Sequence, residues 1–383
     1  MLNIQTSNTL SHKRYITHRF VLYVGLSCNA RCRFCYYLKY LETGKAYKYD
    51  LSFPQIAHLL KIGKWLGKTE VDLSGGEPTI HKDIIKTVYY ARAHLGYKTV
   101  CLITNGLRLA NWDFLKQLVD NGLNDILFSL HSYNPDIHDY LTRVPGSYNK
   151  LLKAIENATK LGLNVRINSV VNMFNFSDLE AHVEFITTLH PKSLNLIVCN
   201  PAEEIGKMEE IKQIGINDYT LIGEKIKKVI SQFRDKIRII NVRFIPFCFM
   251  KGYEKYVRTY WQIIYEREEW DPFMHGVVKK GLILSLLASL GGIFSGFLNP
   301  IIFLGRKNPY TFLAESFQGL RIFLQHTKVP ACQKCALKYI CSGFQKNYIK
   351  KFGYPQVYPY VDMPLIKNPL IFVTDLKDKF IID

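Results

Sequence analysis

The chain has 383 residues, of which 48% are hydrophobic and 21% charged. These are ordinary values for a globular protein, so they exclude a disordered chain, a collagen-like repeat and a coiled-coil rod. The length predicts about two or three domains, or one large α/β domain with an extension. The net charge of +18 would suit nucleic acid, an anionic membrane surface or an anionic cofactor, and it also fits a Lys-rich solvated surface.

The first half of the chain alternates short apolar, β-branched runs with longer segments of helical period. This alternation predicts α/β structure with a parallel sheet, either a partial (β/α)6 TIM-like barrel or a doubly wound sheet. Nearly all strand residues are apolar, as expected for strands that are covered on both faces. The predicted strands are Arg19–Gly25, Glu70–Leu73, Thr99–Ile103, Asp125–Leu130, Val165–Val171 and Leu194–Val198. The predicted helices between them are Pro54–Leu66, Lys82–His94, Trp112–Asn121, Lys150–Leu161 and Leu179–Leu189.

This rhythm changes after Pro201. A charged helix, Asp218–Phe233, and a strand-like run, Ile237–Phe244, lead into a cysteine-containing second half. We therefore expect a core at residues 15–205, an extension at residues 206–350 with an apolar insertion at residues 281–305, and a tail at residues 351–383.

Nine cysteines stand in a long chain whose first residues contain no apolar signal-peptide segment, so metal ligands are expected rather than disulfides. Cys28, Cys32 and Cys35 follow the first predicted strand with the spacing C-x3-C-x2-C. Zinc sites usually present four ligands in two pairs, whereas three closely spaced thiolates on one loop suit a cubane iron–sulfur cluster. Such a cluster keeps one iron open, and an open metal position is what catalysis requires.

A second motif, Gly75-Gly76-Glu77-Pro78, follows the second predicted strand. Two glycines allow a backbone to approach a ligand closely, and the Glu77 carboxylate can accept hydrogen bonds from a ligand ammonium group. Taken alone, the motif also fits a tight turn. Because ligand sites in parallel α/β folds lie beyond the carboxyl ends of the strands, both motifs are expected at one edge of the sheet.

Between Arg19 and Pro201 the chain resembles the radical S-adenosylmethionine (SAM) enzyme superfamily in both motifs, in Phe34 before the third cysteine, and in its βα units. The resemblance implies a [4Fe-4S] cluster on the three cysteines, with the amino and carboxylate groups of SAM at the fourth iron. An electron donor such as flavodoxin or ferredoxin would reduce the cluster. Reductive cleavage would then release methionine and a 5′-deoxyadenosyl radical, which would abstract hydrogen from the substrate.

The resemblance also implies further SAM contacts. Phe34 matches the aromatic residue that abuts the adenine, and Arg143 would hold the SAM carboxylate, although a loop arginine also fits an ordinary surface position. His131 and His138 fit loop or helix-cap positions better than catalytic ones. Polar residues at the third, fourth and fifth strands match positions that line the SAM pocket, namely Thr104, Asn105, Ser129 and Asn168.

Cys332, Cys335 and Cys341, with the spacing C-x2-C-x5-C, resemble the auxiliary-cluster motif of SPASM and twitch extensions of radical SAM enzymes. The full SPASM pattern has a fourth cysteine where this chain has Gln345, and Cys248, which opens the extension, is predicted to replace it. One auxiliary [4Fe-4S] cluster is therefore expected, with a zinc site or no metal as alternatives. The remaining cysteines are expected to be buried core thiols, namely Cys101 and Cys199.

Residues 281–305 carry no charge and are flanked by Lys279-Lys280 and Arg306-Lys307. Their length permits a membrane span, but a single span would put Cys248 and Cys332 on opposite sides of the bilayer. We expect instead either an apolar helical pair that packs on the barrel or covers the active site, or a hairpin on a membrane surface with its basic flanks at anionic headgroups. Lipid contact would favour a lipid or lipid-linked substrate.

Within this apolar stretch, small and cyclic residues are expected to interrupt helical structure. They are Gly291, Gly292, Gly296 and Pro300.

The sequence supports three functions. The first is a cytoplasmic radical SAM enzyme, with membrane association through residues 281–305 as an option, that acts on a peptide, lipid or other biosynthetic intermediate. The second is a tRNA- or cofactor-directed radical SAM enzyme. Nucleic acid is not an expected partner because no basic run accompanies a recognisable nucleic-acid module. Molybdopterin-type enzymes resemble this layout but end in a Gly-Gly tail, which this chain lacks.

The third function is a non-catalytic iron–sulfur electron-transfer or scaffold protein. The motif at Gly75–Pro78 argues against it, because a pure electron carrier needs no SAM pocket.

Overall fold

A computed structural model describes residues 16–199, 214–216, 218–266, 269–296 and 309–373. The predicted core boundary at residue 205 lies outside these ranges, as do residues 297–305 of the apolar stretch, the flank Arg306-Lys307 and the last ten residues of the predicted tail.

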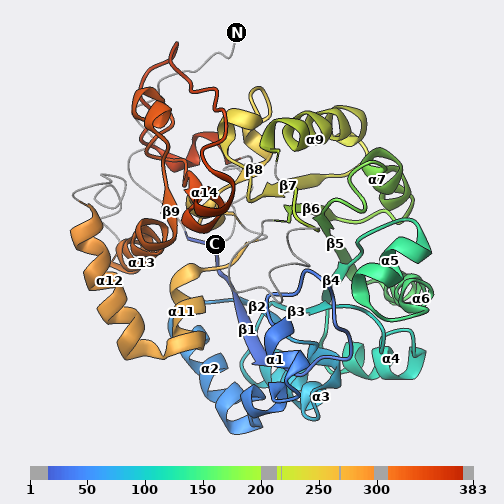
Figure 1. The fold of residues 1–383 in the computed structure, drawn as a ribbon. Coiled ribbons are helices and arrows are strands. Elements are labelled where there is room, and N and C mark those ends of the chain that lie inside the picture. Colours follow the sequence, from blue (N-terminus) through green and yellow to red (C-terminus); the bar gives the residue numbers. More distant parts are fainter. Residues whose placement is uncertain (1–15, 200–213, 217, 267–268, 297–308, 374–383) are drawn as a thin grey trace.

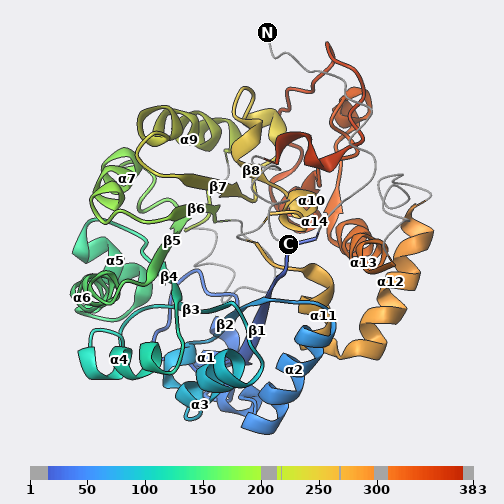
Figure 2. The ribbon, with the colours of Figure 1, turned by 180° about the vertical axis from the view of Figure 1, so that it is seen from behind.

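Eight parallel strands form one curved sheet in the order β1 to β8, with helices around its outer side (Figures 1 and 2). Each strand pairs with its successor in the chain, and no pairing in the described ranges joins β8 back to β1. The fold is therefore the predicted partial TIM-like barrel, with β7 and β8 beyond the six strands expected in the core. The strands are β1 Arg19–Gly25, β2 Glu70–Gly75, β3 Thr99–Thr104, β4 Asp125–Ser129, β5 Asn164–Val171, β6 Ser193–Val198, β7 Ile239–Arg243 and β8 Val257–Arg258. A separate antiparallel pair joins β9 His326–Thr327 to β10 Phe344–Gln345.

The helices follow the predicted ones to within about three residues at most ends. One predicted helix, Lys82–His94, divides into α3 and a π-helical turn at Tyr90–His94. Among the described helices, those that were not predicted are α1, α5, α10, α11, α13 and α14. Of these, α5 has a recognisable start, because Asn134 and Pro135 supply its N-terminal cap and first turn. The helices are α1 Leu38–Glu42, α2 Phe53–Trp65, α3 Ile84–Tyr89, α4 Trp112–Asp120, α5 Pro135–Thr142, α6 Ser147–Lys160, α7 Leu179–Thr188, α9 Tyr219–Phe233, α10 Tyr260–Ile263, α11 Pro272–Lys280, α12 Leu282–Gly296, α13 Pro309–Gln325 and α14 Lys346–Phe352.

The two faces of the sheet differ in polarity. Alternate strand residues form the apolar core, as Phe20 and Leu22 do on β1, while the residues between them include buried charges. Arg166 Nε donates to Asp125 Oδ1 at 2.7 Å, and Arg19 Nη1 lies 2.5 Å from Asp72 Oδ1. The expectation of strands that are apolar on both faces was therefore wrong for one face, where pairing between opposite charges makes burial tolerable.

The extension bridges the open side of the barrel between β8 and β1. The Asp271 amide donates to the Arg19 carbonyl oxygen at 3.0 Å, which ties the segment before α11 to β1. Acidic residues of this segment pair with basic residues from the barrel, in the buried ion pairs Lys68–Asp271, Arg243–Glu269 and Arg258–Glu266. The extension thus completes the barrel rather than forming a detached lobe.

Helix α12 continues through Gly291 and Gly292, so the expectation that these glycines break a helix was wrong. A Cβ atom at Gly292 would lie 1.9 Å from the Ser316 carbonyl oxygen, which shows how closely α12 approaches α13. This close packing offsets the helix-propensity cost of glycine, which is about 1 kcal/mol. Among the described residues, no helix combines the length and apolarity needed to cross a membrane.

Candidate functional site

The two predicted motifs lie side by side at the carboxyl edge of the sheet. Because β1 and β2 are parallel neighbours, the loops that follow them meet. The Gly76 amide donates to Gly25 O at 2.9 Å, and the Glu77 amide donates to Ser27 O at 2.8 Å. Gly75 has φ +135°, and a Cβ there would lie 2.0 Å from Gly25 O. The glycines therefore allow close approach between two loop backbones, while their predicted approach to a ligand stays a prediction.

The loop after β1 presents three partly buried thiols, Cys28, Cys32 and Cys35, none of which forms a disulfide. The backbone amides of Ala30 and Tyr37 donate to the sulfur atoms of Cys28 and Cys35, each at 3.4 Å. Burial raises the pKa of Cys28 to about 12. A bound metal reverses this effect because it deprotonates a coordinating thiol. Three free thiols with N–H···S hydrogen bonds are a donor set that fits an iron–sulfur cluster.

The described residues contain no group of three or more His, Cys, Asp or Glu side chains placed to hold one metal ion. The sulfur atoms around one tetrahedral zinc ion are about 3.8 Å apart, given Zn–S bonds of about 2.3 Å. In a cubane cluster each cysteine binds a different iron, so its ligands are spread more widely. The fit of the Cys28 loop to a cluster therefore rests on its donor set and not on a compact single-ion geometry.

Asp50 supports the start of the cysteine loop and was not predicted from the sequence. Its Oδ1 accepts the amides of Leu26 and Ser27 at 2.9 and 3.0 Å, and its Oδ2 accepts the Ser27 hydroxyl. The other end of the loop is tied to α5, since the Arg33 amide donates to the Leu141 carbonyl oxygen. Asp50 is 23 residues from Ser27 and belongs to no local motif, so no spacing in the sequence could have linked the two.

Glu77 is buried and connects the ends of β2 and β3. Its Oε1 accepts the Thr79 amide, the Thr79 hydroxyl and the Thr104 hydroxyl, at 3.0, 2.6 and 2.7 Å. Its Oε2 accepts the Asn105 amide at 2.8 Å. Burial raises the pKa of Glu77, while these hydrogen bonds oppose that rise. A carboxylate oxygen has two lone pairs, so Oε2 keeps acceptor capacity for the predicted ammonium group.

Asn105 joins this network to the cysteine loop, because its side-chain amide donates to Asn29 Oδ1 at 2.8 Å. Asn29 lies between two of the predicted ligands and was not singled out from the sequence. The ends of β1, β2 and β3 are therefore held together by hydrogen bonds around the place where SAM binding is predicted.

Phe34 packs edge-on against His131, with ring centroids 4.6 Å apart. His131 stacks on His138 at 5.8 Å, and both histidines are buried. Burial lowers the pKa of His138 to about 4, so its ring is neutral near neutral pH. His131 lies in the loop after β4, as expected, whereas His138 lies within α5 and not in a loop or cap. The predicted contact of Phe34 with adenine stays a prediction.

The remaining predicted contacts are distributed along the same edge. Ser129 and Asn168 are register partners on β4 and β5, and Asn168 Oδ1 accepts the Asn195 side chain at 2.8 Å. Arg143, which has φ +57° at the end of α5, pairs with Glu42 of α1 at 3.3 Å. Pro78 begins a 3-10 turn and is buried. The structure therefore brings Ser129 and Asn168 together, whereas Arg143 binds the Glu42 carboxylate of the same chain.

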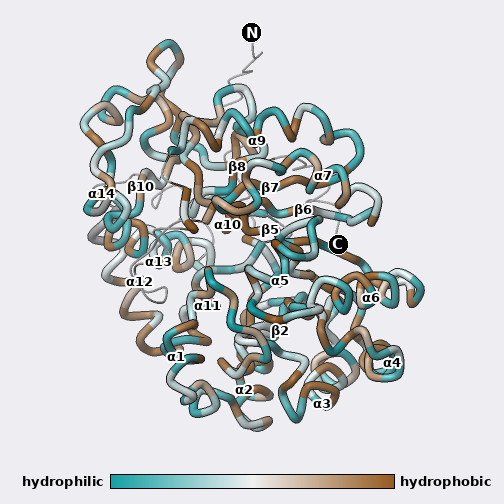
Figure 3. Tube along the Cα trace, turned by 45° about the vertical axis from the view of Figure 1, so that its right-hand side comes forward, coloured by the Kyte–Doolittle hydropathy of each residue, from teal (hydrophilic) through white to brown (hydrophobic). Residues whose placement is uncertain are grey.

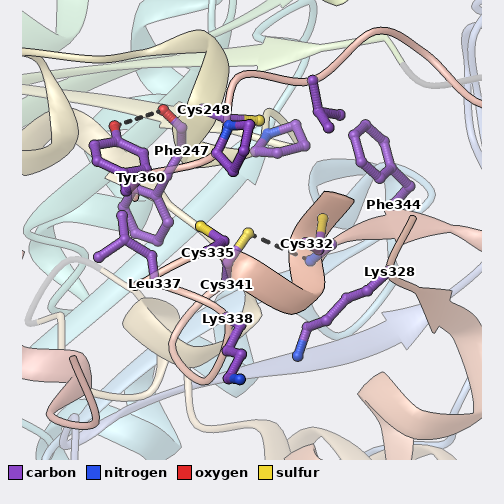
Figure 4. Close-up of a pocket in the computed structure, with 14 residues that line it drawn as sticks. Phe247, Cys248, Lys328, Cys332, Cys335, Leu337, Lys338, Cys341, Phe344 and Tyr360 are labelled. Carbon is purple, nitrogen blue, oxygen red and sulfur yellow. Dashed lines mark hydrogen bonds between the residues drawn. The ribbon is translucent and has the colours of Figure 1, made fainter. Parts of the chain in front are cut away.

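The second cysteine set surrounds one pocket (Figure 4). Cys332, Cys335 and Cys341 lie between β9 and β10, and Cys248 arrives from a 3-10 turn that follows β7. All four cysteines line the pocket and are free thiols. The pKa of Cys332 is raised to about 11, chiefly by burial and in part by the neighbouring Cys341 and Cys335. Gly343 donates its amide to Cys341 Sγ at 3.4 Å. These four thiols also fit an iron–sulfur cluster, and they provide one thiol more than the loop of Cys28, Cys32 and Cys35.

Other parts of the extension cover this pocket. Lys328 and Tyr360 line it, and the Tyr360 hydroxyl donates to the Phe247 carbonyl oxygen at 3.0 Å (Figure 4). Tyr360 belongs to the predicted tail, so that segment packs on the cysteines. Gln345, at the position of the missing SPASM cysteine, lies in β10 opposite His326 and does not line the pocket.

Cys101 and Cys199 are buried free thiols, as expected for core cysteines.

Comparisons with known proteins place residues 22–186 in the family model described as the Radical SAM superfamily. The protein named "Probable GTP 3',8-cyclase" from Saccharolobus islandicus (strain M.14.25 / Kamchatka #1) is 31% identical over 203 residues, which are 53% of this chain and 62% of the relative. The protein with the same name from Sulfurisphaera tokodaii is 29% identical over 220 residues, 57% of this chain and 65% of the relative. The chain thus spans less than two thirds of these relatives.

Among solved structures, Streptococcus suis SuiB matches with 18% sequence identity and a TM-score of 0.48, over 64% of this chain and 49% of SuiB. HydG, a maturase of the [FeFe]-hydrogenase, matches with 16% identity and a TM-score of 0.44, over 60% of this chain and 52% of HydG.

Proposed function

We propose that this chain, which belongs to the radical SAM superfamily through residues 22–186, is an enzyme that cleaves SAM reductively and abstracts hydrogen from an organic substrate. The observation that carries the proposal is the contact between two loops at the carboxyl edge of the barrel. One loop offers three free thiols, and the other is fixed to it through the amides of Gly76 and Glu77. A non-catalytic electron carrier would not need this second loop.

Cys28, Cys32 and Cys35 would hold a [4Fe-4S] cluster, and the N–H···S bonds to two of these sulfurs support this assignment. When bound, such a cluster supplies the electron that converts SAM to methionine and a 5′-deoxyadenosyl radical. Oε2 of Glu77 would accept the SAM ammonium group, and the hydrogen bonds from Thr104 and Asn105 orient this carboxylate.

Cys248, Cys332, Cys335 and Cys341 would hold one auxiliary [4Fe-4S] cluster. Four thiolate ligands leave no iron open, whereas three would leave one for a substrate. The four-thiol pocket therefore supports electron exchange with the substrate as the role of this cluster, rather than substrate coordination.

The proposal is tested by anaerobic reconstitution with iron and sulfide, followed by incubation with SAM and dithionite. Dithionite stands in for a flavodoxin or ferredoxin donor. We expect 5′-deoxyadenosine from the wild-type protein and from Cys199→Ala, which removes a buried cysteine outside both sets. The triple variant Cys28→Ala/Cys32→Ala/Cys35→Ala should form none. Wild-type protein that carries its cluster by visible spectroscopy and still forms no 5′-deoxyadenosine would overturn the proposal.

GTP is the substrate that the names of the relatives favour, and the positive net charge of the chain suits a triphosphate. Consumption of GTP that depends on both SAM and reductant would support it. Formation of 5′-deoxyadenosine without loss of GTP would favour the other substrate classes, a peptide or a lipid-type intermediate.

A further inference from the structure

Helix α12 exposes large apolar side chains and buries polar ones, which is the reverse of an ordinary surface helix. It lies at the outer edge of the molecule, with α13 between it and the barrel, and its trace is largely hydrophobic (Figures 1 and 3). Ser285 and Ser289 are fully buried. Among residues 282–292, whose burial the structure describes, the exposed ones are large aliphatics, with relative exposures of 74% for Ile283, 55% for Leu284, 37% for Leu286, 57% for Leu287 and 54% for Leu290.

The contacts of α12 explain this orientation. Ser285 donates its hydroxyl to Gly281 O at 2.9 Å and Ser289 donates to Ser285 O at 3.0 Å, so the buried hydroxyls are satisfied within the helix. Gly292 packs against the Ser316 backbone of α13. Small residues therefore form the helix–helix contact, as they do between helices in membranes. A surface helix in water would bury its leucines and expose its serines.

We propose that the exposed face of α12 lies in the surface of an anionic lipid bilayer and docks the protein there. The exposed side chains listed above are all aliphatic, without the aromatic and arginine residues that anchor protein–protein interfaces. Lys279 and Lys280 are exposed at the end of α11, one residue before α12, and the sequence from residue 279 to residue 296 contains no acidic residue. This pattern complements anionic headgroups.

The length of α12 agrees with a position in the plane of the membrane. Its 15 residues give a helix of about 22 Å, which is shorter than the hydrocarbon core of about 30 Å. Insertion of one helix face to the depth of the acyl boundary requires no span. It also leaves the four cysteines of the second pocket on one side of the bilayer.

Vesicle flotation of the full chain tests this proposal. The probes are vesicles of phosphatidylcholine mixed with phosphatidylglycerol, and vesicles of phosphatidylcholine alone. We expect wild-type protein to float with the anionic vesicles. The double variant Leu287→Glu/Leu290→Glu should bind at least about tenfold more weakly, because each leucine loses its apolar burial. Lys280→Ala should weaken binding to the anionic vesicles by about fivefold.

The matched control is Leu221→Glu on α9, where a leucine of similar exposure, 53%, lies on another surface. This variant should bind like wild type, and circular dichroism and cluster absorption should be unchanged in all variants. The proposal is overturned if wild-type protein does not float with anionic vesicles, or if Leu221→Glu impairs flotation as much as the α12 variant. Concentration-dependent dimerisation that Leu287→Glu/Leu290→Glu abolishes, without vesicle binding, would assign the face to a second copy of the chain.

Discussion

Replacing Gly76 with alanine should separate the two loops that meet at the predicted SAM site. The added Cβ would lie 2.2 Å from Ser27 O and 2.4 Å from Leu26 O. Both are backbone atoms, so no side-chain rotation can relieve the contact, and the loops must move apart by about 1 Å to reach ordinary van der Waals separation. Overpacking of this kind costs about 1–3 kcal/mol.

The displacement also strains the two backbone hydrogen bonds that join the loops, from Gly76 to Gly25 and from Glu77 to Ser27. Each contributes about 1 kcal/mol, so loss of both together with the overpacking lowers the free energy of unfolding by about 3–5 kcal/mol. Thermal unfolding should show a midpoint lowered by about 4–6 °C, and the yield of 5′-deoxyadenosine should fall.

Gly291→Ala is the matched control for this change. A Cβ there meets only Leu320 Cδ2 at 3.6 Å, an ordinary contact, so the variant should be neutral or stabilised by up to about 1 kcal/mol. If Gly76→Ala melted like wild type and formed as much 5′-deoxyadenosine, the loops would not depend on their close approach and the reasoning would fail.

Three further predictions concern the second cysteine set, acid stability and the barrel closure. Cys248→Ala/Cys332→Ala leaves only two thiols in the second pocket and should lose the auxiliary cluster, seen as about four fewer iron atoms per chain; unchanged iron would contradict the assignment of a cluster to this pocket. The pKa of His138 is about 4 in the folded protein and about 6.5 in the unfolded chain, so between these pH values the unfolded state binds more protons. The contribution of His138 to stability is therefore complete above about pH 6.5 and falls by up to about 1.4 kcal/mol per pH unit below it. His138→Gln should flatten this slope in unfolding measured as a function of pH. Lys68→Met leaves the buried Asp271 carboxylate without its lysine partner and should lower the free energy of unfolding in denaturant by about 3–5 kcal/mol. Lys116→Met, which breaks the exposed pair with Asp120, should lower it by less than about 1 kcal/mol. Equal losses of unfolding free energy in the two variants would refute the role of the buried pair.

The barrel was predictable because its repeated units carry strong local signals. The predicted bounds of β1 match the structure at both ends, and the apolar periodicity located the helices that cover the sheet. β8, with only two residues, gives no periodic signal. The charged inner face was also missed, because an isolated Arg166 or Asp72 in a strand does not reveal its partner on another strand.

The site was predictable where one motif carries the chemistry and was missed where distant segments cooperate. The Cys28 loop was singled out by its spacing, and the Gly75–Pro78 motif by its place after the next strand and by resemblance, whereas the support from Asp50 depends on tertiary contact. The convergence of Cys248 with the later cysteines rested on resemblance, and the shared pocket now gives that prediction a geometric basis. The outward leucines of α12 could not be predicted, because composition does not say which face of an uncharged helix is buried.

The central claim is that two separate cysteine sets each hold one cluster. Iron per chain after anaerobic reconstitution tests it most directly. Two cubane clusters predict about eight iron atoms in the wild-type protein. Removal of Cys28, Cys32 and Cys35 should leave about four, and removal of Cys248, Cys332, Cys335 and Cys341 should also leave about four. A wild-type content of about four iron atoms that only one of these variants abolishes would contradict the account.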